Sequence, residues 1–188
     1  MKTLKRCLTL VVALLTATSC NEELTFSRDY RVAFRFYTVY HPASVLTRCV
    51  DNPGMFCIVK SQLRGSVFHL LVTANDMQTT DDIAITSELE TRLLSEQYMG
   101  ANNALIVGCS LFDGPKAYDG QCPVCLRDKR GINYPLAFTG DGQTVECTKC
   151  KRTFNLRAEG APNDGSEDGK ALLQYPITVS GQYFQVRN

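Results

Sequence analysis

Two cysteine pairs constrain this chain more than any other feature of its sequence. Cys122-Pro-Val-Cys125 is followed, after an interval of 21 residues, by Cys147-Thr-Lys-Cys150. Each pair places two thiols at one tight turn, and two such turns can surround a single ion with a tetrahedron of sulfur atoms. The spacing therefore predicts a metal site whose ligands are Cys122, Cys125, Cys147 and Cys150.

Four thiolate ligands favour Zn²⁺, and a full ligand shell leaves no position for substrate water, so the predicted site is structural. Basic residues close to both pairs would offset its negative charge: Arg127, Lys129, Arg130, Lys149, Lys151 and Arg152. There are two alternatives: each pair forms a disulfide, or one pair is a redox-active dithiol. A thioredoxin-type dithiol would begin a helix after a strand, whereas both pairs are expected here in glycine-rich β surroundings. Metal binding is therefore the favoured interpretation.

Composition limits the remaining possibilities. The chain has 188 residues, of which 44% are hydrophobic, so it can build one ordinary domain with a real core. A formal charge of +1 argues against a nucleic-acid-binding protein, whose affinity would come from releasing counterions. Nine cysteines are too few for a disulfide-packed scaffold of this length. Motifs of serine hydrolases, zinc proteases and nucleotide-binding loops are absent from the sequence, so none of these activities is predicted, and a non-enzymatic role is favoured.

The amino terminus has the pattern of an export signal. Three basic residues precede a short apolar run at positions 8–17, which cannot span a bilayer as a helix. The small residues that follow lead into Cys20, and this arrangement resembles a bacterial lipobox. The resemblance implies a signal peptide at 1–19 and a lipid on Cys20. Ordinary cleavage after Ser19 is the alternative.

If the lipobox is used, residues 20–30 form a tether and residues 31–188 a single domain. The signal removes three of the 20 basic residues, leaving 17 against 19 acidic residues, a balance of −2. The acyl chains would hold the domain at a membrane. We therefore expect an exported protein in the bacterial cell envelope, anchored to the outer membrane, with a protein partner that the sequence does not name.

The hydrophobic pattern predicts a mostly β fold. A strand with one wet face is expected at 31–40, because Val32, Phe34 and Phe36 alternate with Arg31 and Arg35. Further strands are expected at 55–60, 66–73, 104–108, 136–138, 144–146 and 153–156, with a closing hairpin from 172–179 and 183–186. One short helix is expected within 86–98, with Ser87 and Glu90 as its capping box. The carboxylate pairs Asp81-Asp82 and Glu88 with Glu90 are interpreted as a solvated helix start. An exposed loop is expected at 158–169.

The second half of the chain, residues 108–188, resembles a Rieske domain. Ala117-Tyr-Asp-Gly-Gln-Cys-Pro123 is similar to the approach to that family's first cluster loop, and Val145-Glu-Cys-Thr-Lys-Cys150 is similar to the second. The expected closing hairpin also resembles that of the family. The resemblance implies a small antiparallel β-sandwich of three stacked sheets with two metal-binding knuckle loops, and an electron-transfer function through a [2Fe–2S] cluster.

The ligands depart from the family pattern. Rieske loops supply one histidine each, but Val124 and Cys125 stand at the first of these places and Cys150 at the second. His41 and His69, the only histidines, lie far earlier in the chain and are interpreted as surface or strand residues. A Cys₂His₂ cluster is therefore not supported. Zn²⁺ is favoured, and a [2Fe–2S] cluster held by four cysteines is the alternative.

Three further cysteines are left once Cys7 of the signal and Cys20 are set aside: Cys49, Cys57 and Cys109. Cys49 and Cys57 flank the turn Asn52-Pro-Gly54, where a hairpin could bring them together as a disulfide. Two buried free thiols are the other interpretation. Cys109 is expected to be a buried free thiol, with a place near the metal as its alternative.

Three functions follow from these observations. The first is a lipid-anchored binding or scaffold module with a structural zinc site. The second is an electron-transfer protein with a cysteine-ligated [2Fe–2S] cluster. The third is a thiol–disulfide oxidoreductase that uses one CxxC pair.

Overall fold

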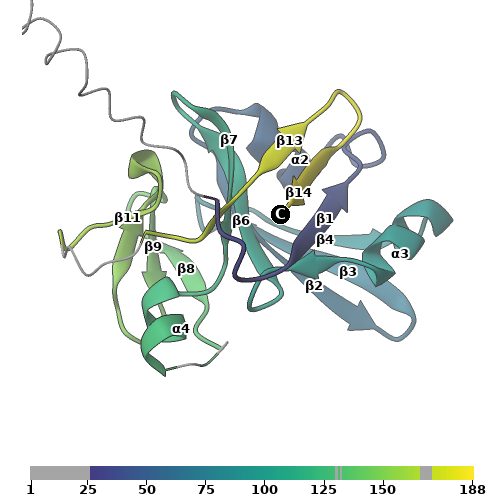
Figure 1. Cartoon of the computed structure of the whole chain (residues 1–188). Coiled ribbons are helices and arrows are strands. Elements are labelled where there is room, and N and C mark those ends of the chain that lie inside the picture. The colour runs from purple at the N-terminus through teal and green to yellow at the C-terminus, as the bar shows by residue number, and fades with distance from the viewer. Residues whose placement is uncertain (1–25, 130, 132, 166–170) are drawn as a thin grey trace, which may run out of the picture.

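The computed structural model describes residues 26–129, 131, 133–165 and 171–188. The predicted signal at 1–19, Cys20 and the first part of the tether lie outside the described residues. The fold is mostly β, as expected, and its strands form three antiparallel sheets (Figure 1).

We call the three sheets the terminal sheet, which contains the first and last strands, the central sheet, and the knuckle sheet, which lies beside the two cysteine pairs. The terminal sheet has the order β13 (Ile177–Val179), β14 (Phe184–Arg187), β1 (Val32–Phe36), β5 (Tyr98–Met99). The central sheet has the order β12 (Gln174–Tyr175), β7 (Gly114–Asp119), β6 (Ala104–Ser110), β2 (Phe56–Arg64), β3 (Val67–Ala74), β4 (Thr80–Ile85). The knuckle sheet has the order β11 (Ala161–Pro162), β10 (Thr153–Asn155), β9 (Thr144–Cys147), β8 (Leu136–Thr139). The helical segments are α2 (Val45–Asp51), α3 (Glu88–Ser95), α4 (Pro123–Lys129) and the short 3₁₀ helix η1 (Leu156–Ala158).

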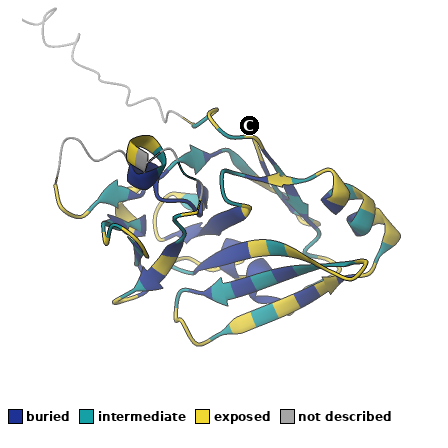
Figure 2. Ribbon diagram, turned by 90° about the horizontal axis from the view of Figure 1, so that it is seen from below, coloured by how far each residue is buried: buried dark blue, intermediate teal, exposed yellow. Residues whose placement is uncertain are grey.

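The central sheet is buried on both faces where it passes between the other two sheets. All seven residues of β6 are buried. Leu105 and Val107 belong to the core shared with the terminal sheet, whereas Ile106 packs into the core shared with the knuckle sheet. Burial on both faces explains why this strand is apolar at successive positions rather than alternating. Figure 2 shows the buried residues concentrated where the sheets face one another.

The first strand confirms the alternation read from the sequence. Val32, Phe34 and Phe36 are buried, and the residues between them are partly exposed. The strand ends at Phe36 instead of continuing to residue 40, because a turn follows directly. It pairs with β14, so that Phe34 lies opposite Val186. The two ends of the described chain therefore close one sheet.

The predicted closing hairpin is only partly correct. Strands β13 and β14 pair as expected, but the segment at 172–179 is divided between two sheets. Gln174 and Tyr175 pair with β7 in the central sheet, and Ile177 begins β13 in the terminal sheet. Pro176 separates them, and a proline has no N–H with which to continue a ladder. The strand therefore changes sheets at this residue.

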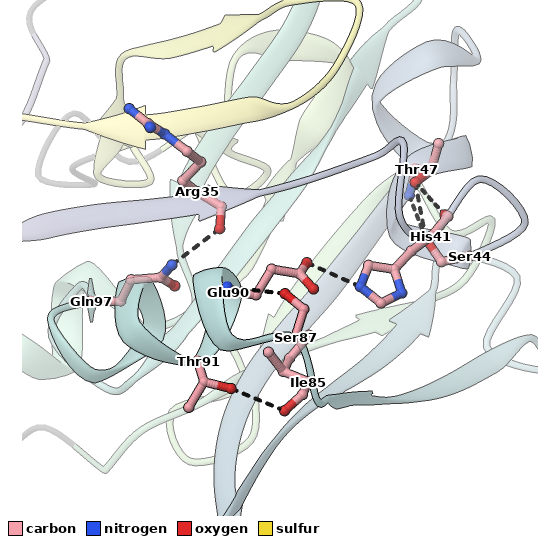
Figure 3. A network of polar contacts seen from close by, with 9 residues as sticks. All are labelled: Arg35, His41, Ser44, Thr47, Ile85, Ser87, Glu90, Thr91 and Gln97. Carbon is pink, nitrogen blue, oxygen red and sulfur yellow. Dashed lines mark hydrogen bonds and ion pairs between the residues drawn. The ribbon is translucent and has the colours of Figure 1, made fainter.

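Helix α3 is found where it was predicted. Ser87 is its N-cap, and its Oγ accepts a hydrogen bond from the Glu90 N–H at 3.1 Å. The carboxylate of the buried Glu90 does not return to the cap, as a full capping box requires. It contacts His41 Nε2 instead, at 3.1 Å, and so ties the helix to the segment after β1 (Figure 3).

Several elements were missed by the sequence patterns, among them helix α2 and strand β4. Helix α2 has Ser44 as its N-cap, but its seven residues are too few for a clear helical period. The interpretation of Asp81-Asp82 as a helix start was wrong, because both lie in strand β4. The alternation of buried Ile83 and Ile85 with exposed neighbours is the strand signal that accounts for it.

A buried carboxylate joins the central sheet to the loop after β5. Asp119 is fully buried and accepts hydrogen bonds from Tyr175 Oη, Ala101 N and Gln121 N, each at 2.8 Å. Burial nevertheless raises the pKa of Asp119, because the loss of hydration outweighs the hydrogen bonds that it accepts. The folded state therefore binds this proton more tightly than the unfolded chain does.

This raised pKa predicts a pH dependence of stability. The contribution of Asp119 to the free energy of unfolding should increase as the pH falls through the folded pKa, and level off below the unfolded pKa of about 3.9. Urea unfolding of the parent and of Asp119→Asn at pH 7 and pH 4.5 measures this contribution. Groups other than Asp119 titrate alike in both proteins, so their effects cancel in the difference between the two free energies of unfolding. The parent should gain stability relative to the variant at pH 4.5. An identical difference at both pH values would contradict the assignment.

Candidate metal centre

The first cysteine pair lies where the chain leaves the central sheet. Strand β7 ends at Asp119, and the Gly120 N–H donates to the Ala104 carbonyl at 2.8 Å. A side chain at Gly120 would come within 2.7 Å of Ala104 Cβ, so this close approach requires glycine. The Cys122 N–H then donates to the Tyr134 carbonyl at 3.0 Å, and α4 begins at Pro123. Proline suits the first position of a helix because that N–H has no partner there.

The second pair forms the turn between β9 and β10. Cys147 is the last residue of β9, and its N–H donates to the Arg152 carbonyl at 2.8 Å. Its Sγ accepts hydrogen bonds from the N–H groups of Lys149 and Cys150, both at 3.4 Å. Lys151 has a φ of 64°, which turns the chain back into β10. Backbone N–H groups directed at a sulfur orient it and stabilise its thiolate form.

The structure brings all four predicted cysteines together. Their Sγ atoms lie within 4.8 Å of one another, and three of the four residues are buried, with Cys150 half-buried. The Cys122 and Cys150 sulfurs are 3.7 Å apart, and those of Cys125 and Cys147 are 3.8 Å apart. A tetrahedron with metal–sulfur bonds of about 2.3 Å has edges of about 3.8 Å. The four thiols therefore form a cluster that could hold a metal ion.

The close approaches do not fit the disulfide alternative. All four residues are free thiols. Each short sulfur–sulfur distance joins the first pair to the second, whereas the alternative required a bond within each pair. Distances of 3.7 and 3.8 Å also far exceed the S–S bond length of about 2.05 Å.

Burial and hydrogen bonding act on the thiols in opposite directions. Burial raises the pKa of Cys122, and it raises that of Cys125 to about 11. Burial also acts to raise the pKa of Cys150, but hydrogen bonds outweigh it, first that from the Arg152 backbone, and the pKa is lowered. A cation among the four sulfurs would favour the thiolate form of all of them.

The neighbouring basic residues offset the charge of the site less than expected. Arg127 pairs with Asp128 at 2.6 Å, and Lys151 pairs with Glu146 at 3.0 Å. Arg152 lies 3.8 Å from Asp164. The side chain of Lys129 and the whole of Arg130 lie outside the described residues. These carboxylates therefore neutralise part of the positive charge of the basic residues near the thiols.

The expected β surroundings are correct for the second pair and wrong for the first. Cys122 directly precedes α4 and Cys125 lies in its first turn, so this pair does begin a helix after strand β7. Because this pair begins a helix, the sequence argument against a redox dithiol is weaker than expected. The helix signal that the sequence reasoning missed is the proline at the first helical position. The remaining argument against a redox dithiol is geometric. The Cys122 and Cys125 sulfurs lie 3.7 and 3.8 Å from sulfurs of the second pair.

The other cysteines lie apart from this cluster. Cys49 and Cys57 are buried free thiols, and the turn at 52–54 joins helix α2 to strand β2 rather than two strands of a hairpin. Burial, followed by a hydrogen bond with Cys49, raises the pKa of Cys57. Cys109 is a free thiol with 7% exposure and is not part of the group of four.

Neither histidine lies in the metal-ligand group. His69 is in strand β3, as one interpretation expected, and its Nδ1 lies 2.6 Å from Asp82 Oδ1. His41 is held by Glu90. These contacts agree with structural roles for both histidines.

In the part of the chain that the structure describes, no helix has the length and apolarity needed to cross a bilayer. Comparisons with known proteins give no match to a family model, to a curated protein or to a solved structure.

Proposed function

We propose that this protein is a lipid-anchored binding or scaffold domain of the cell envelope, with one structural Zn²⁺ held by Cys122, Cys125, Cys147 and Cys150. The observation that carries the proposal is the cluster of four sulfurs within 4.8 Å of one another. Two turns from different elements converge there, and a full thiolate shell stabilises a fold without supplying a reactive position.

The spacing of the sulfurs supports one ion over a cluster. Around a single ion all four sulfurs are neighbours, and the two short distances run between the two pairs. A [2Fe–2S] cluster places two irons and two bridging sulfides between its two pairs of thiolates, which moves these pairs apart. The compact arrangement therefore favours zinc, and the [2Fe–2S] cluster remains the second candidate.

The arrangement of the sheets supports a Rieske-like architecture. The resemblance implied three stacked antiparallel sheets, and the chain has three antiparallel sheets. The knuckle sheet is formed by residues between β7 and β12, two strands that pair with each other in the central sheet. The metal-binding part is thus an insertion between neighbouring strands. In this proposal Cys20 carries the lipid, and the segment before β1 links the domain to the membrane.

Metal analysis of purified protein tests the function. We expect one zinc per chain, no visible absorption, and loss of the zinc when the thiols of the unfolded chain are titrated. Purification is done both aerobically and anaerobically, because an iron–sulfur cluster can be lost in air. Iron with acid-labile sulfide and a visible spectrum would replace the zinc proposal by electron transfer. Metal-free protein with disulfide-reductase activity would support the thiol–disulfide alternative.

A further inference from the structure

An arginine-lined groove lies on the terminal sheet, on the face turned away from the core. It has a cavity volume of about 310 Å³, in the lower range of small-ligand sites. Arg31 and Arg35 reach it from the β1 side, and Arg187 reaches it from β14. Ala33 lies opposite Arg187 in the strand register, so only a methyl group stands on β1 between Arg31 and Arg35 on this face.

Neutral groups hold two of these arginines in position. The Arg31 Cζ lies 4.0 Å from the centre of the Tyr98 ring. Arg35 lies over the Tyr183 ring at 4.8 Å, and its Nε and Nη2 both donate to the side-chain oxygen of Gln185. Stacking and amide contacts fix a guanidinium group without cancelling its charge. The groove is thus organised before any ligand arrives.

The positive charge of the groove is largely uncompensated. Within the described residues, none of the three arginines has a carboxylate within the 4.0 Å of an ion pair. One acidic side chain, Glu96, lines the groove from beyond α3. The segment after α3 forms one wall of the groove. It is attached to the terminal sheet because Gln97 Nε2 donates to the Arg35 carbonyl at 3.1 Å (Figure 3).

We propose that this groove binds a small soluble ligand that presents carboxylate or phosphate oxygens. Three guanidinium groups outnumber the carboxylates that line the groove, so it favours an anion. Guanidinium groups pair with both kinds of oxyanion through two parallel hydrogen bonds. The groove shares no residue with the four-cysteine cluster, so this proposal does not depend on the identity of the metal.

Calorimetric titration of the purified, metal-loaded protein with pyrophosphate and with succinate at low ionic strength tests the proposal. One of the two probes should bind with a stoichiometry of one. Arg35→Gln and Arg187→Gln should each weaken its binding about tenfold or more. Arg92→Gln is the matched control, since it removes the same charge from an exposed residue of α3 that does not line the groove. It should leave the affinity unchanged.

Ala33→Leu separates specific binding from general attraction. It fills the space between the arginines while keeping every charge, and it should abolish binding. Melting temperature and metal content are measured for each variant, so that a misfolded variant is recognised. Arg187→Lys then takes its place, because lysine keeps the charge but cannot form the two parallel hydrogen bonds of a guanidinium group. Failure of both probes to bind, equal weakening in Arg92→Gln, or binding only to vesicles containing phosphatidylglycerol would overturn the proposal.

Discussion

Replacing Cys147 by serine is expected to release the bound metal and to destabilise the domain by more than about 4 kcal/mol. Cys147 is fully buried, and its sulfur receives two backbone N–H groups in addition to contacting Cys125. The free energy of binding a structural metal is also free energy of folding, because the unfolded chain has no preformed site. For a chain of this size the melting temperature should fall by roughly 10 °C or more.

Cys109→Ser is the control for this experiment. Cys109 is also a buried free thiol, but it lies outside the group of four. Its replacement changes the same atom in a buried position and should leave one metal per chain. Metal content by elemental analysis and thermal unfolding by circular dichroism are measured on both variants. Retained metal with unchanged melting in Cys147→Ser would remove the basis for a structural site.

Replacing Phe154 by alanine is expected to cost about 3–5 kcal/mol of stability. Phe154 is fully buried in β10, opposite Val145, in the same core as Cys122, Cys125 and Cys147. Its ring fills the space between the knuckle sheet and the central sheet. Truncation loses the transfer free energy of the ring and leaves a cavity that the surrounding strands can close only in part.

Phe112→Ala provides the comparison for the loss of Phe154. Phe112 is 92% exposed in the turn between β6 and β7, so its loss should change stability by less than about 0.5 kcal/mol. Denaturant unfolding of the two variants measures the difference. Phe154→Ala should still carry metal when folded, because all four ligands are present. Equal stabilities of the two variants would contradict the placement of Phe154 in the core.

The site was read from the sequence more completely than the fold. A CxxC pair is a local feature, since two thiols three residues apart share one turn in most backbones. The four ligands could therefore be named without knowing which strands surround them. The distances between the sulfurs of the two pairs depend on the tertiary structure. They are short because the start of α4 packs against the turn between β9 and β10.

Elements with a clear period or a cap were predicted correctly, and short or irregular ones were not. Alternation identified β1, and a serine cap identified α3. Helix α4 was missed because it has only seven residues and its first turn contains Cys125, so the cysteine spacing dominates the pattern. The division of the last strand segment at Pro176 was missed because hydrophobicity is the same on both sides of the proline.

The sequence by itself determined which thiols could act together and which face of β1 is apolar, because both follow from spacings of a few residues. Only the tertiary structure decided the sheet to which each strand belongs and placed Arg35 and Arg187 on the same face of one sheet. Those two residues are far apart along the chain and lie on adjacent strands. Their proximity follows from the pairing of β1 with β14, which buries Phe34 and Val186 on the opposite face. Long-range pairing of this kind depends on the total apolar surface that is buried, and no short segment of the sequence specifies it.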